Sequence, residues 1–137
     1  MVPNGKWAVI TGVAGFIGSN LLRALIERGY EVIGIGSLAN GFMRNIDMFL
    51  SHPRFTFVNA DITDPATLQE ISHADYVVHL AAYKIPRYGN VLDTLRINLK
   101  GTENILDAAR RINCKVVFAS TSDVYGKNPS VPFKETD

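Results

Sequence analysis

The 137-residue sequence predicts an α/β domain built on a mostly parallel sheet. Strand-like and helix-like apolar patterns alternate along the chain. A turn rich in glycine joins the first strand to the first helix, and polar residues cluster where the strands end. Such alternation is typical of parallel sheets that carry helices on both faces. Right-handed crossovers and a glycine turn after the first strand predict the strand order 3-2-1-4-5.

The first strand, turn and helix are the parts that a dinucleotide diphosphate needs. An apolar strand over residues 7–10 runs into a turn with Gly12, Gly15 and Gly18, and a helix begins at Phe16. Gly12 permits a sharp turn, Gly15 lets a phosphate approach the backbone, and Gly18 permits close packing of helix and strand. The start of the helix favours an anion by about 0.3–1 kcal/mol. Together these features predict a doubly wound, Rossmann-like sheet; the alternative is a turn whose glycines serve packing alone.

The first helix is expected to present one broad apolar face. The face comprises Phe16, Ile17, Leu21, Leu22, Leu25 and Ile26.

The remaining elements follow in the same alternation. Strands are expected at residues 31–36, 55–60, 76–82 and 115–119, a short helix at 43–50, and a loop at 126–137. Asp64 and Pro65 open a helix as its N-cap and first residue. A long helix is predicted over 90–112, with apolar residues near helical spacing at Leu92, Leu95, Leu99, Ile105, Leu106 and Ala109.

Composition narrows the classes of partner. The formal net charge of +1 gives no strong field for nucleic acid or an anionic membrane, so neither is expected. No apolar run reaches the roughly 18 residues needed to span a bilayer, and a cytoplasmic location is expected. Cys114 is the only cysteine and is interpreted as a passive residue. The three histidines lack metal-ligand spacing, so no metal is expected.

Five motifs in a fixed order are collectively distinctive. They are Thr11-Gly12-x-x-Gly15-Phe16-Ile17-Gly18, Asp61-Ile62, His79-Leu80-Ala81-Ala82, Asn98-x-x-Gly101-Thr102 and Ser120-Thr121-Ser122-Asp123-Val124-Tyr125-Gly126. With them the chain resembles the extended short-chain dehydrogenases/reductases, a family of sugar-nucleotide epimerases and dehydratases. Members similar to UDP-glucose 4-epimerase match best, and the resemblance covers nearly the whole chain.

The resemblance implies a set of residues that bind the cofactor. Gly12, Gly15, Phe16 and Ile17 would lie along the pyrophosphate, Asp61 and Ile62 beside the adenine, Leu80, Ala81, Ala82 and Lys84 along the middle ribose, and Asn98 against backbone groups near the nicotinamide. Asp61 has a structural alternative, because it could simply cap the loop after the third strand. His79 is interpreted as a packed strand residue and not as a base.

The end of the second strand departs from the family pattern. Members that bind NAD often carry an acidic residue there, which accepts hydrogen bonds from the ribose hydroxyls. This chain has Gly36 and then Ser37. Ser37 or Asn40 could serve the ribose instead, and Arg44 could reach a 2′-phosphate. NAD is the expected cofactor, and NADP stays open.

The resemblance also implies what the chain does. Thr121 occupies the catalytic Ser/Thr position, where it would hydrogen-bond the reacting group of the substrate. None of the tyrosines has lysine four residues later, so the family's Tyr-x-x-x-Lys pair is missing. We therefore expect residues 1–137 to be the NAD(P)-binding portion of a nucleotide-sugar epimerase, inactive alone, without the later strands and the substrate-binding part.

Two other functions stay open at this point. One is a non-catalytic NAD(P)-sensing or scaffold module, which the missing pair would favour. The other is a dehydratase or reductase of the same family; a single carboxylate, Asp123, where dehydratases carry an Asp–Glu pair disfavours dehydration. A homo-oligomer is expected, since dimers of the family commonly use helices of the kind predicted at 90–112.

Overall fold

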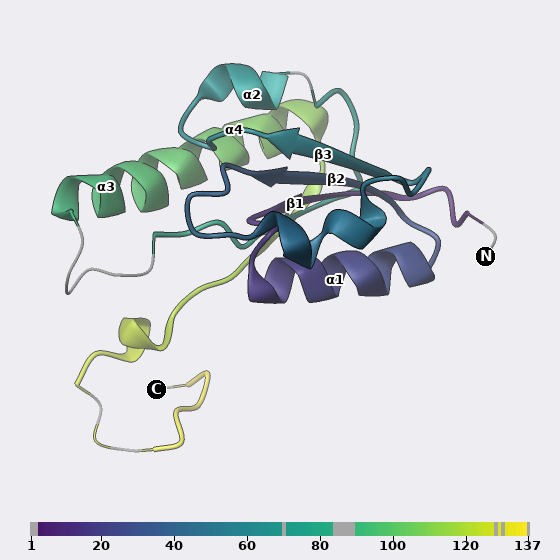
Figure 1. The fold of residues 1–137 in the computed structure, drawn as a ribbon. Helices are drawn as coiled ribbons and strands as arrows, with labels where there is room; N and C mark the ends of the chain where they lie inside the picture. The colour runs from purple at the N-terminus through teal and green to yellow at the C-terminus, as the bar shows by residue number, and fades with distance from the viewer. Residues whose placement is uncertain (1–2, 70, 84–89, 128, 130, 137) are drawn as a thin grey trace.

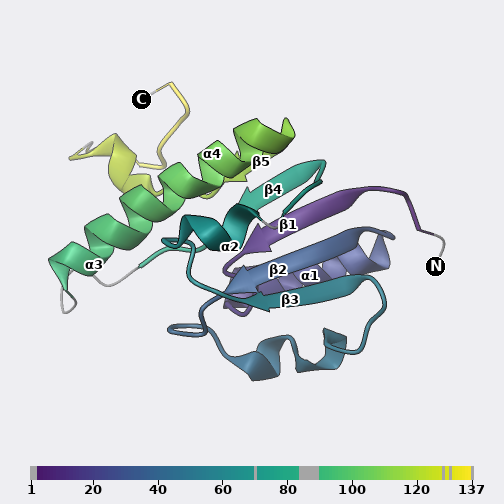
Figure 2. The same ribbon diagram turned by 90° about the horizontal axis from the view of Figure 1, so that it is seen from above.

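The computed structural model describes residues 3–69, 71–83, 90–127, 129 and 131–136 of the chain. Its centre is a five-stranded parallel sheet in the order β3-β2-β1-β4-β5, which confirms the predicted order. Figure 2 shows β3, β2, β1 and β4 side by side, with the arrowheads that mark their carboxyl ends on the same side of the sheet. The strands are β1 (Trp7–Thr11), β2 (Glu31–Gly36), β3 (Phe55–Asn59), β4 (Tyr76–His79) and β5 (Lys115–Phe118).

Helices cover both faces of the sheet. Helix α1 (Phe16–Glu27) lies on one face, and α2 (Pro65–Gln69) and α4 (Thr102–Ile112) lie on the other (Figure 1). Helix α3 (Val91–Leu95) continues through a π-helical segment, Arg96–Gly101, into α4. Among the described residues, no helix is both long enough and apolar enough to cross a membrane.

The side chains of adjacent residues of β1 pack into two separate hydrophobic cores, one on each face of the sheet. Val9 packs with Ile35, Val77 and Ile105 on the α4 side, whereas Ile10 packs on the α1 side. Both side chains are fully buried because successive residues of a strand point to opposite faces and both faces are covered. This arrangement explains why β1 reads as a continuous apolar run.

The prediction for the apolar face of α1 was wrong at its first turn. Phe16 is 83% exposed and Ile17 is 65% exposed. The buried stripe of α1 is Gly18, Leu22 and Ile26, spaced four residues apart. At about 100° per residue, Phe16 lies roughly 200° around the helix from Gly18, on the side away from the sheet.

Several other predictions need smaller corrections. Residues 43–50 form two short 3₁₀ turns, Met43–Asn45 and Asp47–Phe49, instead of a helix. Strand β4 ends at His79 and not at residue 82, because the amides of Leu80 and Ala81 donate to a side chain of β1.

The long helix is buried on a narrower face than the apolar pattern predicted. Within its α4 part, the buried residues are Asn104, Ile105, Ala108 and Ala109. The exposed leucines are Leu92, Leu95, Leu99 and Leu106.

Candidate functional site

A cavity of about 360 Å³ lies at the carboxyl edge of the sheet. The turns that follow the first four strands form it together with α3. Its lining comprises Gly12, Ala14, Gly15, Gly36, Ser37, Leu38, Ala39, Asn40, Gly41, Ala60, Asp61, Ile62, Leu80, Ala81, Ala82, Tyr83, Asp93, Arg96 and Ile97. In open parallel sheets this edge is where ligands bind.

The glycine turn has the geometry that the sequence predicts. Gly12 has φ +71°, and its N–H donates to the Ile35 carbonyl oxygen at 2.8 Å. A Cβ on Gly12 would lie 2.9 Å from the Ala81 nitrogen, so a larger residue fits neither the conformation nor the space. A Cβ on Gly18 would meet the Gly12 carbonyl oxygen. Packing and turning therefore account for Gly12 and Gly18 without any ligand.

Gly15 and the start of α1 supply the evidence for an anion site. Gly15 caps α1 without a side-chain hydrogen bond, and the first turn of α1 has no acidic residue. Within the described residues, the N–H groups of Phe16, Ile17 and Gly18 donate to no oxygen. Three free amides at a helix start, beside a glycine that leaves their approach open, fit a diphosphate.

The loop after β2 is fastened to this turn. The Phe42 N–H and the Asn45 Nδ2 both donate to the Ala14 carbonyl oxygen, at 3.1 and 2.8 Å. A Cβ on Gly41 would lie 2.9 Å from the Ala14 Cβ, so the contact needs glycine. Residues 37–40 are thereby held over the cavity. Sequence reasoning did not identify the Asn45 anchor, because an asparagine in a polar loop gives no signal of its own.

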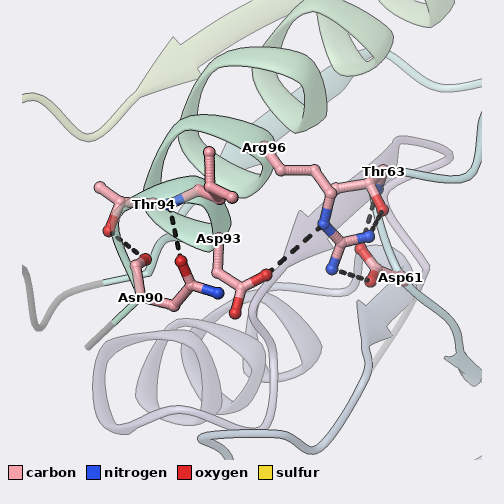
Figure 3. A network of polar contacts seen from close by, with 7 residues as sticks. Asp61, Thr63, Asn90, Asp93, Thr94 and Arg96 are labelled. Carbon is pink, nitrogen blue, oxygen red and sulfur yellow. Dashed lines mark hydrogen bonds and ion pairs between the residues drawn. The ribbon is translucent and has the colours of Figure 1, made fainter.

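Arg96 lines the cavity and lies between its two carboxylates, Asp61 and Asp93 (Figure 3). Its guanidinium lies 3.7 Å from Asp61 Oδ2 and 3.8 Å from Asp93 Oδ1, and its Nη1 donates to Thr63 Oγ1 at 3.1 Å. All three charged side chains are about half exposed, so each pair stabilises the fold by less than about 1 kcal/mol. Arg96 and Asp93 were not predicted as site residues. Arg96 lies 35 positions from Asp61, and only the folded chain brings them together.

Asp61 does cap its loop, as the structural alternative proposed. Its Oδ1 accepts from the Thr63 N–H at 2.9 Å, which leaves Oδ2 toward Arg96. The cap and a contact with adenine are compatible, because a carboxylate has further acceptor capacity on both oxygens.

A buried chain of hydrogen bonds joins β1, β4 and α4. Thr11 Oγ1 accepts from the N–H groups of Leu80 and Ala81, both at 3.1 Å, and lies 2.7 Å from His79 Nδ1. The Thr11 proton is therefore free only for His79 Nδ1, and the imidazole proton sits on Nε2 toward Thr102 Oγ1 at 3.0 Å. Thr102 in turn donates to the Asn98 carbonyl oxygen at 2.7 Å.

His79 is thus a packed strand residue, as the sequence indicated. Burial lowers the pKa of its imidazole, which keeps the ring neutral within this series of hydrogen bonds.

Asn98 bonds backbone groups, as expected; it does not line the cavity itself, but its partner Tyr83 does. Its Oδ1 accepts from the Tyr83 N–H at 2.7 Å, and its Nδ2 donates to the Tyr83 carbonyl oxygen at 3.1 Å. This pair of bonds fixes the chain after β4, where Leu80, Ala81 and Ala82 line the cavity. The nicotinamide role predicted for Asn98 stays a prediction.

The structure brings most of the predicted cofactor residues to one cavity. Those that line it are Gly12, Gly15, Ser37, Asn40, Asp61, Ile62, Leu80, Ala81 and Ala82. Phe16 and Ile17 do not line it, and their side chains are exposed, so their position along the pyrophosphate stays a prediction. Lys84 lies outside the described residues.

Thr121 is not part of the cavity lining. Its exposed hydroxyl donates to Asp123 Oδ2 and accepts from the Asp123 N–H, both at 3.2 Å, and so caps the turn Ser122–Tyr125. Its catalytic role stays a prediction. Among the described residues, no group of three or more His, Cys, Asp or Glu side chains is placed to hold a metal ion.

Comparison with known proteins identifies the family. The family model described as "NAD dependent epimerase/dehydratase family" matches residues 8–137. The chain therefore belongs to the NAD-dependent epimerase/dehydratase family, and the resemblance carried by the five motifs is confirmed.

Individual relatives are longer than this chain. UDP-glucuronic acid decarboxylase 1 of Arabidopsis thaliana is 39% identical over 131 residues, which are 93% of this chain and 29% of the relative. A solved UDP-galactose 4-epimerase is 34% identical with a TM-score of 0.81, covering 92% of this chain and 41% of that one. The Bordetella bronchiseptica enzyme WbmH in complex with NAD⁺ is 34% identical with a TM-score of 0.82, covering 90% and 41%. The chain thus spans less than half the length of each.

Proposed function

We propose that this chain binds NAD as the cofactor-binding part of a nucleotide-sugar epimerase. The observation that carries the proposal is the start of α1, where the N–H groups of Phe16, Ile17 and Gly18 donate to no oxygen within the described residues and follow directly on Gly15, which lines the cavity. A family of NAD-dependent enzymes and a relative with NAD⁺ bound support the choice of ligand.

Each part of the cavity has a role in this proposal. The amides of α1 hold the diphosphate, Asp61 and Ile62 contact the adenine, and Ser37 and Asn40 hydrogen-bond the ribose. When bound, NAD supplies reversible hydride acceptance from a sugar carbon, so that return of the hydride to the other face inverts that centre. The relatives are longer than this chain, so the reaction is proposed for the whole protein.

Decarboxylation of a nucleotide-linked sugar acid is the second candidate. The observation that favours it is the 39% identity with UDP-glucuronic acid decarboxylase 1. A non-catalytic NAD-binding module is the third, since the fold and the cavity alone serve binding without any reaction. All three share the same cavity and differ in what happens after the cofactor binds.

Titration calorimetry with NAD tests the shared part. Gly15→Ala places a methyl group in the path of the diphosphate, and its Cβ comes no closer than 3.2 Å to other atoms. We expect this variant to stay folded and to bind NAD at least about tenfold more weakly. Asn20→Ala, on the exposed side of the same helix, is the matched control and should bind NAD normally. Equal NAD affinity in both variants would contradict the proposal.

Assays on UDP-sugars then separate the reactions. Interconversion of UDP-glucose and UDP-galactose supports the epimerase, whereas release of CO₂ from UDP-glucuronate supports the decarboxylase. Tight NAD binding with neither reaction in the intact natural protein supports the binding module. Thr121→Val should lower turnover more than NAD affinity if Thr121 contacts the substrate.

A homo-oligomer is part of the proposal. Leu92, Leu95 and Leu99 are 73%, 56% and 69% exposed along α3 and the π-helical segment. Apolar residues exposed at spacings of three and four favour association with another helix.

A further inference from the structure

We infer that the cavity accepts a 2′-phosphorylated adenosine, so that NADP binds as well as NAD, and that Gly36 determines this tolerance. The inference rests on the proposed function and extends it to cofactor specificity. In dinucleotide-binding folds, the residue that ends the second strand selects between the two cofactors. A carboxylate there accepts hydrogen bonds from the ribose hydroxyls and repels a 2′-phosphate.

The end of β2 offers no such carboxylate. Gly36 ends the strand and lines the cavity, and the residues that follow it there are Ser37, Leu38, Ala39, Asn40 and Gly41. None of these side chains is charged. Within the described residues, Ser37 Oγ and the Asn40 amide make no side-chain hydrogen bond, so both can donate to a hydroxyl or to a phosphate oxygen.

Sterics do not require the glycine at position 36. A Cβ there would lie 3.9 Å from Phe57 Cε2, an ordinary van der Waals distance, and Gly36 does not have a positive φ. Gly12 and Gly41 differ, since a Cβ on either would come within 2.9 Å of a neighbour. The fold therefore has room for an aspartate at position 36, and the missing carboxylate is a property of the site and not of the packing.

The negative charge of the carboxylates elsewhere in the cavity lining is partly neutralised by a nearby guanidinium group. Asp61 and Asp93 are the acidic residues of the lining, and the Arg96 guanidinium lies within 4 Å of both. Asp61 Oδ1 also accepts a hydrogen bond from the Thr63 N–H. These carboxylates therefore repel a phosphate less than free ones would.

The loop that would meet the ribose is held in place. Leu38 has φ +60°, and the hydrogen bonds of Phe42 and Asn45 to the Ala14 carbonyl oxygen fix the far end of the loop to the glycine turn after β1. Arg44, which could have reached a 2′-phosphate, lies over the Phe42 ring at 4.4 Å and does not line the cavity. The tolerance therefore comes from neutral donors and a missing carboxylate.

Calorimetric titration of the protein with NAD and with NADP tests the inference. We expect the two dissociation constants to lie within about tenfold of each other. Gly36→Asp should weaken NADP roughly 10- to 100-fold, through repulsion between the new carboxylate and the 2′-phosphate, and should leave NAD as tight or tighter. Gly36→Asn, of the same size without the charge, should keep NADP within about threefold of the unaltered protein.

The outcomes separate the inference from the proposed function. NAD binding with NADP more than about 30-fold weaker in the unaltered protein would overturn the inference and leave the proposed function standing. Equal effects of Gly36→Asp and Gly36→Asn would also overturn it, because bulk and not charge would then set the preference. Failure of both nucleotides to bind would overturn the inference and the proposed function together. The ratio in the unaltered protein decides the matter even if a variant does not fold.

Discussion

Replacing Thr11 by valine should destabilise the domain far more than its single hydroxyl suggests. The Thr11 side chain is fully buried at the end of β1. Its hydroxyl oxygen accepts from the N–H groups of Leu80 and Ala81, and its O–H donates to His79 Nδ1. Valine keeps the shape of threonine and removes all three bonds at once.

The magnitude follows from the partners that lose their bonds. Each unsatisfied buried polar group costs about 1–3 kcal/mol, and the two amides, which are partly buried, fall at the low end of that range. We therefore expect Thr11→Val to lower the free energy of unfolding by about 2–5 kcal/mol. That is a large share of the 5–15 kcal/mol typical of a domain. Thr11→Ser keeps the hydroxyl and loses one methyl, at a cost of about 1 kcal/mol.

Urea unfolding of both variants, followed by circular dichroism, measures the difference. NAD affinity should fall in the valine variant as well, since Leu80 and Ala81 line the cavity. If Thr11→Val and Thr11→Ser unfold with free energies within about 0.5 kcal/mol of each other, the hydrogen-bond chain does not hold this part of the fold.

Three further predictions follow from the same structure. Because burial lowers the pKa of His79, its neutral form is favoured by folding; the associated stability is complete above the ordinary pKa of about 6.5 and is lost as the pH falls through the folded value. Urea midpoints measured between about pH 5 and 8 should show this loss on acidification, and His79→Gln should flatten it. Gly41→Ala should cost about 1–3 kcal/mol and weaken NAD binding, because its Cβ would lie 2.9 Å from Ala14 Cβ; unchanged melting would contradict the anchoring of the loop. Leu99→Lys should lower the mass seen by light scattering if α3 and its π-helical extension form an oligomer interface, and an unchanged mass would refute that use of the helix.

The strand order and the glycine turn could be predicted because their signals are local. β2 matches its predicted bounds of 31–36, and the alternation of elements leaves few right-handed topologies. The motif at residues 12–18 combines a positive φ at Gly12 with two close contacts, and each demands glycine for its own reason. Each requirement concerns a single residue position, so it can be recognised from the sequence without knowledge of the tertiary structure.

Which face of each helix is buried could not be predicted as well, because an apolar side chain does not by itself show which element packs against it. Phe16 and Leu99 are large, apolar and at helical positions, yet both are exposed among the described residues. The buried side of a helix includes small residues as well, and in α1 it includes Gly18, which packs against Gly12 and Val13 of the turn after β1.

The ion pairs and hydrogen bonds of the site also could not be predicted from the sequence pattern. The approach of Arg96 to Asp61 joins the end of α3 to the loop after β3, and it depends on how the two elements cross. The anchoring of the loop after β2 by Asn45 has the same origin, since its partner Ala14 lies in the glycine turn after β1. Ordinary charged and polar residues of this kind become site residues only through the fold.

Amide chemical shifts recorded by NMR during titration with NAD test whether the start of α1 binds the dinucleotide. We expect saturable binding, with the largest shifts at the amides of Gly15, Phe16, Ile17 and Gly18 and smaller ones at Ser37 and Asp61. Absence of binding, or shifts that cluster away from the start of α1, would contradict it.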